Sequence, residues 1–473
     1  MEVIYNYVIS PASNILWSYG LVYVIILMGL YFTWKTKFVQ FRHFFHMFKL
    51  LGESRGKKDH KQSISSFQAF CIGVAARVGG GNLAGVALAI VLGGPGAVFW
   101  MWAMALVGAA SAFVESTLAQ VYKVRDGQSY RGGPAYYMQH ALGKRWMGIL
   151  FAILLILTYG FVFNAIQSNI VSLALKESFG WNVWITGIIS AIIIGIVIFG
   201  GVKRIAGVTE IVVPLMAVAY VLVVGYVIIV NFTMIPHVFL IIIKSAFGFQ
   251  QAAGGVIGGS LAMTMTMGVK RGFYSNEAGM GSAPNAAATA EVTHPAKQGF
   301  IQSLGVYTDT LLICSATAFV VILAGIYPGG DLQGIQLTQQ SLNVLVGNWG
   351  GYFISVLVIL FALSTIIGNY YYGETNVEFI STKKIWLTIY RLLVMAWILF
   401  GSVQKVLMVW GTGDLSMGLM AVVNIIAIVM LGGIAFKVLN DYINQLKEGK
   451  DPVFHKENID LKGYVECWGK DEN

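Results

Sequence analysis

The stretch RVGGGNLAGV, at residues 77–86, places a positive charge and three consecutive glycines inside an otherwise apolar run. Glycine is unfavourable in a helix interior, so this stretch favours a break in a helix. A helix broken inside a bilayer exposes backbone N–H and C=O groups that need polar partners. Free N–H groups at a helix N-terminus suit a carboxylate, and free carbonyls suit a cation or an ammonium group. The stretch therefore predicts a site for an amino acid zwitterion and a cation.

A second group of glycines lies in AFGFQQAAGGVIGGS, at residues 246–260. Glycines also let membrane helices pack closely, and this packing role is the alternative for either group alone. The segment GGGNLA fits a loose dinucleotide-binding pattern, but that pattern requires a preceding strand and an acid about 20 residues later. The flanks here are apolar and the first downstream acid is Glu115, which argues against a dinucleotide site.

The composition is that of an integral membrane protein. Of 473 residues, 57% are hydrophobic and only 11% are charged, and the mean hydropathy is +0.71. A soluble domain carries about 25% charged residues, so this chain lacks the charge to cover a surface in water. A helix of about 20 apolar residues spans a bilayer. The sequence therefore predicts an all-α polytopic membrane protein with eleven spans, at 15–34, 64–92, 97–121, 146–172, 183–200, 208–230, 242–268, 299–326, 346–373, 386–403 and 416–437.

Lysines and arginines set the expected orientation, because basic residues gather in cytoplasmic loops. Most of the 31 Lys and Arg residues fall in alternate loops and in the C-terminal tail, and the other side keeps only Lys176, Lys244 and Lys405. We therefore expect a multi-pass protein of the plasma membrane with its N-terminus outside and its C-terminus in the cytoplasm. The net charge of +9 then faces the cytoplasmic leaflet, so no nucleic acid partner is expected.

The two glycine-rich spans, 64–92 and 242–268, are five spans apart. Because five is odd, two groups of five helices would enter the membrane from opposite sides. This arrangement is typical of an inverted repeat whose binding site lies where the interrupted helices meet. The expected regions are an N-terminal part at 1–62, a first repeat at 63–232, a second repeat at 233–438 and a cytoplasmic tail at 439–473.

Several motifs resemble the alanine or glycine:cation symporter family, also called the sodium:alanine symporters. The run GVKRGFYSNEAGMGSAPNAAATA at 268–290 is the most specific of them. Other blocks of the family resemble AARVGGGNLAGVA at 75–87, ESTLAQVYKV at 115–124, RGGPAYYM at 131–138 and FNAIQSN at 163–169. The resemblance covers nearly the whole chain and implies a LeuT-type 5+5 fold with one additional N-terminal helix.

The resemblance also implies which residues hold the substrate, a small neutral amino acid. Backbone amides of the first glycine group would bind its carboxylate, and carbonyls of the second group would bind its amino group. Phe247 or Phe249 would close the side-chain pocket. The implied site residues are Gly79, Gly80, Gly81, Asn82, Gln167, Phe247, Phe249, Gly254 and Gly255.

One position departs from the family pattern, because Gly80 stands where the family usually has Thr. The missing side chain predicts a larger pocket or a looser loop, so a substrate as large as glutamine fits the expectation. The alternative is that the glycine changes nothing, since the implied contact is made by backbone.

A Na⁺ site is implied by the same resemblance, and hard cations take oxygen ligands. Its ligands would be the hydroxyls of Ser364 and Thr365, in FALST at 361–365, and the carbonyls of Ala75, Val78 and Phe361. Hydroxyls in membrane helices also bond back to a carbonyl one turn earlier, which is the alternative for both residues. No organic cofactor is expected.

Four charged residues lie within or beside the spans, where an ionised group faces protein and usually pairs. We expect Arg77 to pair with Glu115. Asp309 is a candidate for a second ion site or a proton-linked carboxylate. Glu277 lies in a Gly- and Ala-rich connector and is expected to be structural or part of a gate.

Together these features predict a secondary active symporter that couples Na⁺ influx to uptake of alanine, glycine or glutamine by alternating access. An H⁺-coupled symporter is the nearest alternative, and a channel or a membrane enzyme are alternatives of a different class. The sequence has no H-E-x-x-H and no G-x-S-x-G motif, so no enzyme is expected. The cysteines Cys71, Cys314 and Cys467 lack the spacing of a metal site or a disulfide framework. We expect a monomer embedded in the lipid bilayer.

Overall fold

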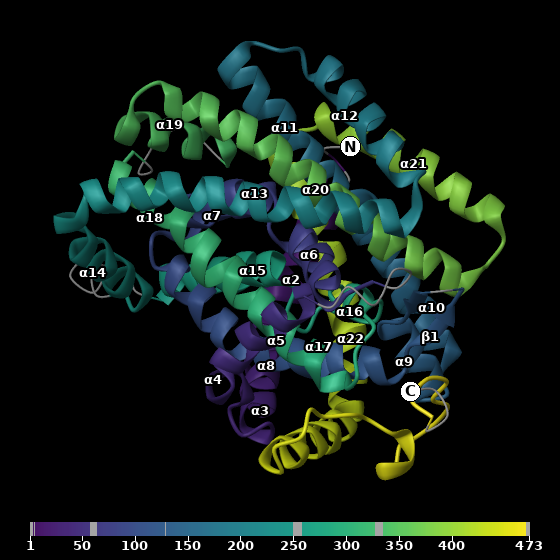
Figure 1. Cartoon of the computed structure of the whole chain (residues 1–473). Coiled ribbons are helices and arrows are strands. Elements are labelled where there is room, and N and C mark those ends of the chain that lie inside the picture. The colour runs from purple at the N-terminus through teal and green to yellow at the C-terminus, as the bar shows by residue number, and fades with distance from the viewer. Residues whose placement is uncertain are drawn as a thin grey trace.

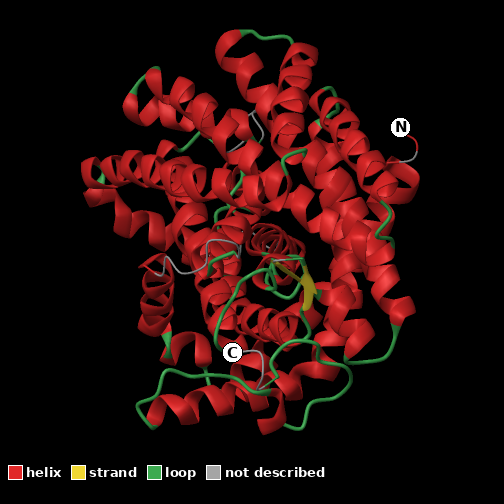
Figure 2. Ribbon diagram, turned by 45° about the vertical axis from the view of Figure 1, so that its right-hand side comes forward, coloured by secondary structure: helices red, strands yellow, loops and turns green. Residues whose placement is uncertain are grey.

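The computed structural model describes residues 3, 5–56, 64–127, 129–248, 258–326 and 334–469. Within these ranges the chain is mostly helical, with one short hairpin of two strands (Figures 1 and 2). The elements up to residue 230 are η1 Tyr5–Ile9, α2 Ser10–Leu16, η2 Trp17–Leu21, α3 Val22–Lys35, α4 Val39–Arg42, α5 Phe44–Gly56, α6 Ser66–Arg77, α7 Gly80–Gly93, α8 Ala97–Val121, β1 Val124–Asp126, β2 Ser129–Arg131, α9 Pro134–His140, α10 Arg145–Leu155, η3 Ile156–Val162, α11 Phe163–Phe179, α12 Val183–Ile198 and α13 Gly201–Val230.

The remaining elements continue the same all-helical pattern. They are η4 Phe232–Met234, α14 Ile235–Ala246, α15 Gly258–Asn276, α16 Pro284–Ala287, α17 Pro295–Tyr307, η5 Thr308–Cys314, α18 Ser315–Ala324, α19 Ile335–Val346, α20 Trp349–Ile380, α21 Lys384–Ser402, α22 Val406–Lys447 and η6 Lys456–Asn458.

Eight described helical stretches are long and apolar enough to cross a membrane. They are Ser66–Gly93, Ala97–Val121, Arg145–Phe179, Gly201–Val230, Pro295–Ala324, Trp349–Ile380, Lys384–Ser402 and Val406–Lys447. Three shorter apolar helices are Val22–Lys35, Val183–Ile198 and Phe232–Ala246. The chain is therefore an all-α polytopic membrane protein, while eleven spans remain a prediction.

Some expected bounds differ from the structure. The span at 242–268 was expected to be interrupted by its glycine group, and the described residues agree, because α14 ends at Ala246 and α15 begins at Gly258, with residues 249–257 outside the described ranges. The boundary expected at 438 falls inside α22, which continues to Lys447 because its apolar face keeps packing through Tyr442. The first helical region begins at Tyr5 instead of residue 15.

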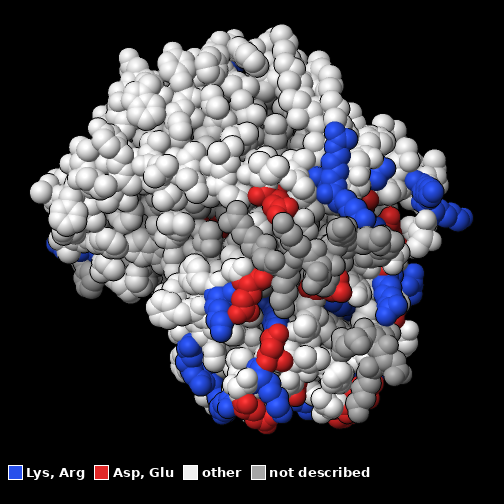
Figure 3. Space-filling view, in the orientation of Figure 1, with Lys and Arg blue, Asp and Glu red and all other residues white. Residues whose placement is uncertain are grey.

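Helix α8 lies in the middle of the bundle and packs against α3, α15 and α17 (Figure 1). The middle of α8 is a run of small residues, GAASA at 108–112, and a Cβ on Gly108 would lie 2.9 Å from the Cβ of Ala278. Small residues let helix backbones approach closely in a membrane. Large apolar side chains instead point outward from α12, α13 and α21. Figure 3 shows that in this view charged side chains gather on the lower part and the right-hand side of the molecule, while the upper left is almost free of charge.

The C-terminal tail, residues 448–469, is bound to the helical bundle. Trp468 is 6% exposed, and its indole Nε1 donates a hydrogen bond to the carbonyl of Gln120 at 2.9 Å. The Lys123 ammonium lies 4.6 Å from the centre of the Trp468 ring and donates to the carbonyl of Ala290 at 3.0 Å. The Phe454 amide donates to the carbonyl of Thr293. The tail thus joins the end of α8 to the connector between α15 and α17.

We expect the tail to bind more tightly as pH rises above 7. Burial lowers the pKa of Lys123 from 10.5 to about 7, although Cys467 and Glu291 act in the opposite direction. With the tail released, Lys123 regains its ordinary pKa, so between about pH 7 and 10.5 the released state binds more protons and docking is favoured by raising the pH. Limited proteolysis should therefore cut the tail more slowly at pH 9 than at pH 6.5.

The matched control is Lys123→Met, which removes the titrating group and cancels any pH dependence of the protease. A tail whose cleavage changes with pH equally in both proteins would contradict this prediction.

Candidate functional site

The first glycine group interrupts a helix, as the sequence predicts. A capping box of Ser65 and Gln68 starts α6, which ends at Arg77; Val78 and Gly79 are not helical, and α7 begins at Gly80. The amide of Gly79 donates to Oδ1 of Asn82 at 2.9 Å. Asn82, the third residue of the new helix, therefore satisfies the amide of the residue at its N-cap, and the break is stabilised from within the sequence G-G-G-N.

The N-terminus of α7 faces Gln167 of α11. The amide of Gly80 donates to Oε1 of Gln167 at 2.9 Å, and Nε2 of Gln167 donates to the hydroxyl of Tyr274 at 3.2 Å. A Cβ on Gly80 would lie 2.9 Å from Gln167 Oε1 and 3.1 Å from Ile170, and a Cβ on Gly81 would collide with the Tyr274 ring. The amide expected to bind a carboxylate is thus held by a side-chain oxygen that a carboxylate oxygen can replace.

On the α6 side of the break, backbone carbonyls face α20. The hydroxyl of Thr365 donates to the carbonyl of Ala75 at 2.7 Å and lies 3.5 Å from that of Val78. The hydroxyl of Ser364 donates back to the carbonyl of Phe361 at 3.0 Å. The five oxygens of the implied cation site therefore come from two facing segments, the end of α6 and the middle of α20. The Ser364 hydroxyl also bonds back to a carbonyl of its own helix, which is the alternative role considered for it above.

Asp309 approaches the break from the π-helical segment η5, where such segments often mark functional sites. Its carboxylate is fully buried and accepts hydrogen bonds from Asn82 Nδ2 at 2.5 Å, Ser275 Oγ at 2.5 Å and Thr310 Oγ1 at 2.8 Å. Asn82 thus connects Asp309 to the amide of Gly79. This contact brings a negative charge to the centre of the break.

The expected ion pair between Arg77 and Glu115 does not form. Nη1 of Arg77 instead donates to Oε1 of Gln302 at 3.1 Å. Glu115 accepts the amides of Gly279 and Gly281 at 3.0 and 3.1 Å and Asn424 Nδ2 at 3.0 Å. Both glycines have positive φ angles, which turn their amides toward the carboxylate and satisfy it without a cation.

Glu277 lies in the same connector as the glycines that bind Glu115. It has a φ of 58°, which is uncommon for a residue other than glycine. Its Oε2 accepts the Ser282 hydroxyl at 2.8 Å. Glu277 and Glu115 together hold the connector between α15 and α17 against α8.

Of the two aromatic residues expected to close the pocket, Phe247 lies away from the break. Phe247 ends α14, is 44% exposed, and its ring lies 4.9 Å from that of Phe99 near the start of α8. That position is at the other end of α7 from Gly80, because α14 ends against the turn that joins α7 to α8. Phe249, Gly254 and Gly255 lie outside the described residues.

Other aromatic residues, which the sequence did not single out, line the break instead. Tyr274 packs between Phe163, at a ring distance of 4.6 Å, and Trp410, at 5.0 Å. Tyr274 and Ser275 belong to the GVKRGFYSNEAG run, so that motif was the available signal for them. Trp410 is on α22 and no local pattern marks it.

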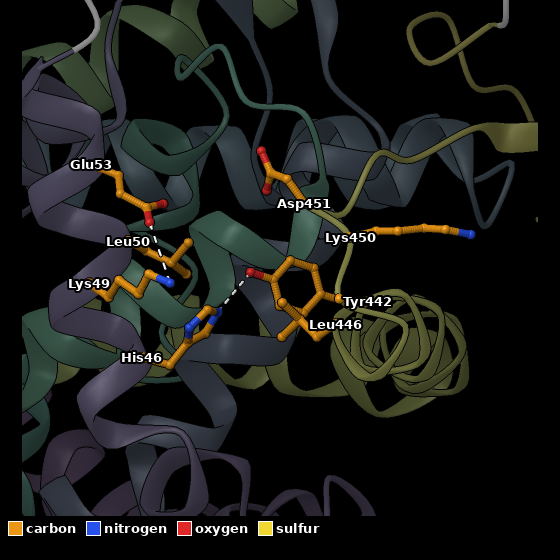
Figure 4. Close-up of a pocket in the computed structure, with 9 residues that line it drawn as sticks. His46, Lys49, Leu50, Glu53, Tyr442, Leu446, Lys450 and Asp451 are labelled. Carbon is orange, nitrogen blue, oxygen red and sulfur yellow. Dashed lines mark hydrogen bonds and ion pairs between the residues drawn. The ribbon is translucent and has the colours of Figure 1, made fainter.

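Among the pockets formed by described residues, two open ones lie outside this region. The larger, of about 520 Å³, lies between α5 and the end of α22, where His46 points toward the Tyr442 hydroxyl 2.8 Å away (Figure 4). Its charges are already paired within the chain, as Lys49 with Glu53 and Asp451 with Lys297. A pocket of about 340 Å³ beside the β1–β2 hairpin likewise mixes arginines with carboxylates. In this second pocket Arg131 is already paired with Asp126 and Glu378.

The relatives of the chain point in the same direction as this geometry. It is 52% identical over 468 residues to the amino-acid carrier protein AlsT of Bacillus subtilis, covering 99% of this chain and 98% of that protein. It is also 52% identical to the probable sodium/glutamine symporter GlnT of the same organism, with 99% and 97% covered. The putative sodium/proton-dependent alanine carrier protein YrbD of B. subtilis is 40% identical, with 98% and 97% covered.

The profile of the sodium:alanine symporter family matches residues 1–456, nearly the whole chain. The family consists of transporters, so the expectation that this protein is not an enzyme is confirmed. The interrupted helix, its buried polar cluster and the match along the chain agree. This protein belongs to the sodium:alanine symporter family.

Proposed function

We propose that this protein is a secondary active symporter of the plasma membrane that couples Na⁺ influx to uptake of a small neutral amino acid. The observation that carries the proposal is the break at Val78 and Gly79, which offers carbonyls and a hydroxyl on one side and a helix N-terminus on the other. Alanine, glycine and glutamine are the proposed substrates. The name of AlsT supports an amino acid as the substrate, and the names of GlnT and YrbD support sodium coupling with glutamine or alanine.

The contacts at the break suggest how ion and substrate act on each other. A Na⁺ ion between the carbonyls of Ala75 and Val78 and the hydroxyl of Thr365 turns the hydroxyl proton away and ties α6 to α20. A substrate carboxylate takes the place of Gln167 Oε1 at the amide of Gly80. Na⁺ binding and substrate binding both hold the same short break in one conformation. Binding of one therefore raises the affinity for the other, which is positive coupling between the two ligands.

The test is uptake of labelled amino acids into proteoliposomes under an inward Na⁺ gradient. We expect alanine, glycine or glutamine uptake that collapses when choline replaces Na⁺. Uptake that persists unchanged in choline would exclude Na⁺ coupling.

Coupling to H⁺ is the second candidate, and the buried carboxylate of Asp309 at the break favours it. The name of YrbD includes both ions. A pH gradient that drives uptake in Na⁺-free buffer would support H⁺ coupling, and the same assay separates the two ions.

The proposed architecture is the LeuT-type 5+5 inverted repeat with an additional N-terminal helix, functioning as a monomer. It is supported by the break between α6 and α7 and by the separation of α14 from α15 at the matching position. Labelling of single cysteines from either side of the membrane tests the proposed outside N-terminus and cytoplasmic C-terminus.

Replacing Gly80 with threonine should narrow the substrate range. The new Cβ would push on Gln167 and Ile170, which lie 2.9 and 3.1 Å from its position. We expect glutamine uptake to fall about tenfold more than alanine uptake, a cost typical of one or two extra methylenes in a pocket. Competition against one labelled substrate measures the ratio.

Gly207→Thr is the matched control, because a Cβ at Gly207 meets nothing within 4 Å. A glutamine-to-alanine ratio in Gly80→Thr equal to that of the control would reject the pocket-size interpretation.

A further inference from the structure

A buried cluster of charges lies between α15 and α22, one aromatic layer from the break. Arg271 is 3% exposed, and its Nη2 contacts both oxygens of Asp414, at 2.7 and 2.6 Å. The neighbouring Lys270 lies 3.4 Å from the same carboxylate. Two buried cations thus share one carboxylate, which leaves an excess positive charge in this cluster of described residues.

Arg271 also has hydrogen-bonding capacity to spare. Its Nε and Nη1 are buried and have no hydrogen-bond partner among the described residues. A guanidinium carries five N–H donors, and Asp414 engages only Nη2. Burying donors of a charged group without partners costs free energy, so these atoms are suited to an acceptor that arrives and leaves.

The guanidinium is held in a fixed orientation beside the substrate site. It lies 4.6 Å from the centre of the Trp410 ring, and Trp410 packs on Tyr274 at 5.0 Å. The Tyr274 hydroxyl accepts a hydrogen bond from Gln167, which in turn accepts the amide of Gly80. On α7, a Cβ on Gly85 would lie 2.9 Å from Trp410 and 3.8 Å from Arg271 Cδ. The Trp410–Tyr274 pair thus lies between Arg271 and the Gln167 side chain at the break.

The additional N-terminal helix supports this cluster. Trp17 is fully buried, and its Nε1 donates to the backbone carbonyl of Asp414 at 2.9 Å. The Lys270 ammonium lies 5.5 Å from the centre of the Trp17 ring. Trp17 is therefore a positioning residue for Asp414 and Lys270.

We propose that Arg271 forms a second carboxylate-binding subsite for the transported amino acid, between the break and the Gly93 end of α7. The substrate carboxylate binds the free N–H groups of Arg271 while the Trp410–Tyr274 pair is displaced, and passes from there to the amide of Gly80. The excess positive charge selects a carboxylate, and Trp410 provides an apolar surface for a small side chain. This inference rests on the proposed amino acid transport.

The experiment compares wild type with Arg271→Gln, Arg271→Lys and the double variant Arg271→Gln/Asp414→Asn in proteoliposomes at saturating Na⁺. The double variant removes both charges of the Arg271–Asp414 pair, so the net charge of the cluster, with Lys270 still present, is the same as in wild type. We expect KM for the amino acid to rise at least about 30-fold in Arg271→Gln and in the double variant, with a much smaller change in kcat. Arg271→Lys should recover part of the loss.

A carboxylate-specific readout accompanies the kinetics. Alaninamide, which lacks the carboxylate, should inhibit wild type far less than alanine does, and this preference should shrink in the double variant. Trp102→Phe is the control for loosened packing, because it removes one indole hydrogen bond, to the Ser315 hydroxyl at 2.8 Å, away from the Arg271 cluster; its KM should stay within about threefold of wild type.

A KM in the double variant equal to that of wild type, or a loss confined to kcat, would overturn the subsite. If wild type transports no amino acid, the proposed function fails instead. If wild type transports amino acids without Na⁺ and KM still rises in the Arg271 variants, the Na⁺ coupling is rejected and the subsite is supported.

Discussion

Replacing Thr365 with valine is expected to raise the Na⁺ concentration for half-maximal uptake at least about tenfold, because the loss of one hydroxyl ligand costs on the order of 1.5 kcal/mol or more. Thr365 is the side chain that meets the carbonyls of Ala75 and Val78, at 2.7 and 3.5 Å. Valine keeps the shape of the side chain and replaces the hydroxyl with a methyl group, which cannot bind a cation. Initial uptake rates across a series of Na⁺ concentrations measure the effect.

Thr375→Val is the matched control on the same helix. Thr375 is also fully buried, and its hydroxyl only bonds back to the carbonyl of Tyr371 at 3.2 Å. Its Na⁺ dependence should equal that of wild type. Equal Na⁺ dependence in Thr365→Val and Thr375→Val would remove Thr365 from the cation site.

Replacing Asp309 with asparagine is expected to lower the transport rate by about 100-fold or more. The Asp309 carboxylate accepts three hydrogen bonds, from Asn82, Ser275 and Thr310. An asparagine amide would present a donor to at least one of these donors and would remove the negative charge at the break, both costly in a buried site. The measurement is the initial uptake rate at saturating Na⁺ and substrate, with the amount of folded protein determined by size-exclusion chromatography.

Asp460→Asn serves as the control, since the Asp460 side chain is exposed and lies 3.6 Å from Lys437. A rate in Asp309→Asn within about threefold of this control would show that the carboxylate only packs against the break. Uptake by Asp309→Asn that remains driven by Na⁺ but no longer by a pH gradient would identify Asp309 as the proton-linked group.

Much of the local structure could be predicted from the chain alone. Apolar runs of membrane-spanning length predict the spans, and the bounds expected for 97–121 agree with helix α8. The break at Gly79 was predictable because helix preference is a property of the residues themselves. The motif at 268–290 was sufficient to identify the family, which the match over residues 1–456 confirms.

The partners of the buried charges were not predictable in the same way. Arg77 and Glu115 are both in apolar runs, but Glu115 is satisfied by the amides of Gly279 and Gly281. A pattern of apolar and charged residues does not show which backbone amides will point toward a buried carboxylate. A charged residue in a membrane span predicts that it has a partner. It does not predict whether that partner is a side chain or a backbone group.

The amino acid sequence therefore fixes where the helix must open, since the conformational cost of glycine is local and independent of the rest of the chain. The tertiary structure decides what lines the opening: Asp309 reaches Asn82 across 227 positions, and Trp410 reaches Arg271 from another helix. Such contacts depend on how helices pack, because side chains far apart in the chain meet only when their helices lie side by side. The backbone groups that the break exposes can therefore be predicted from the sequence. The side chains that select among substrates are brought to the break by the helices packed around it.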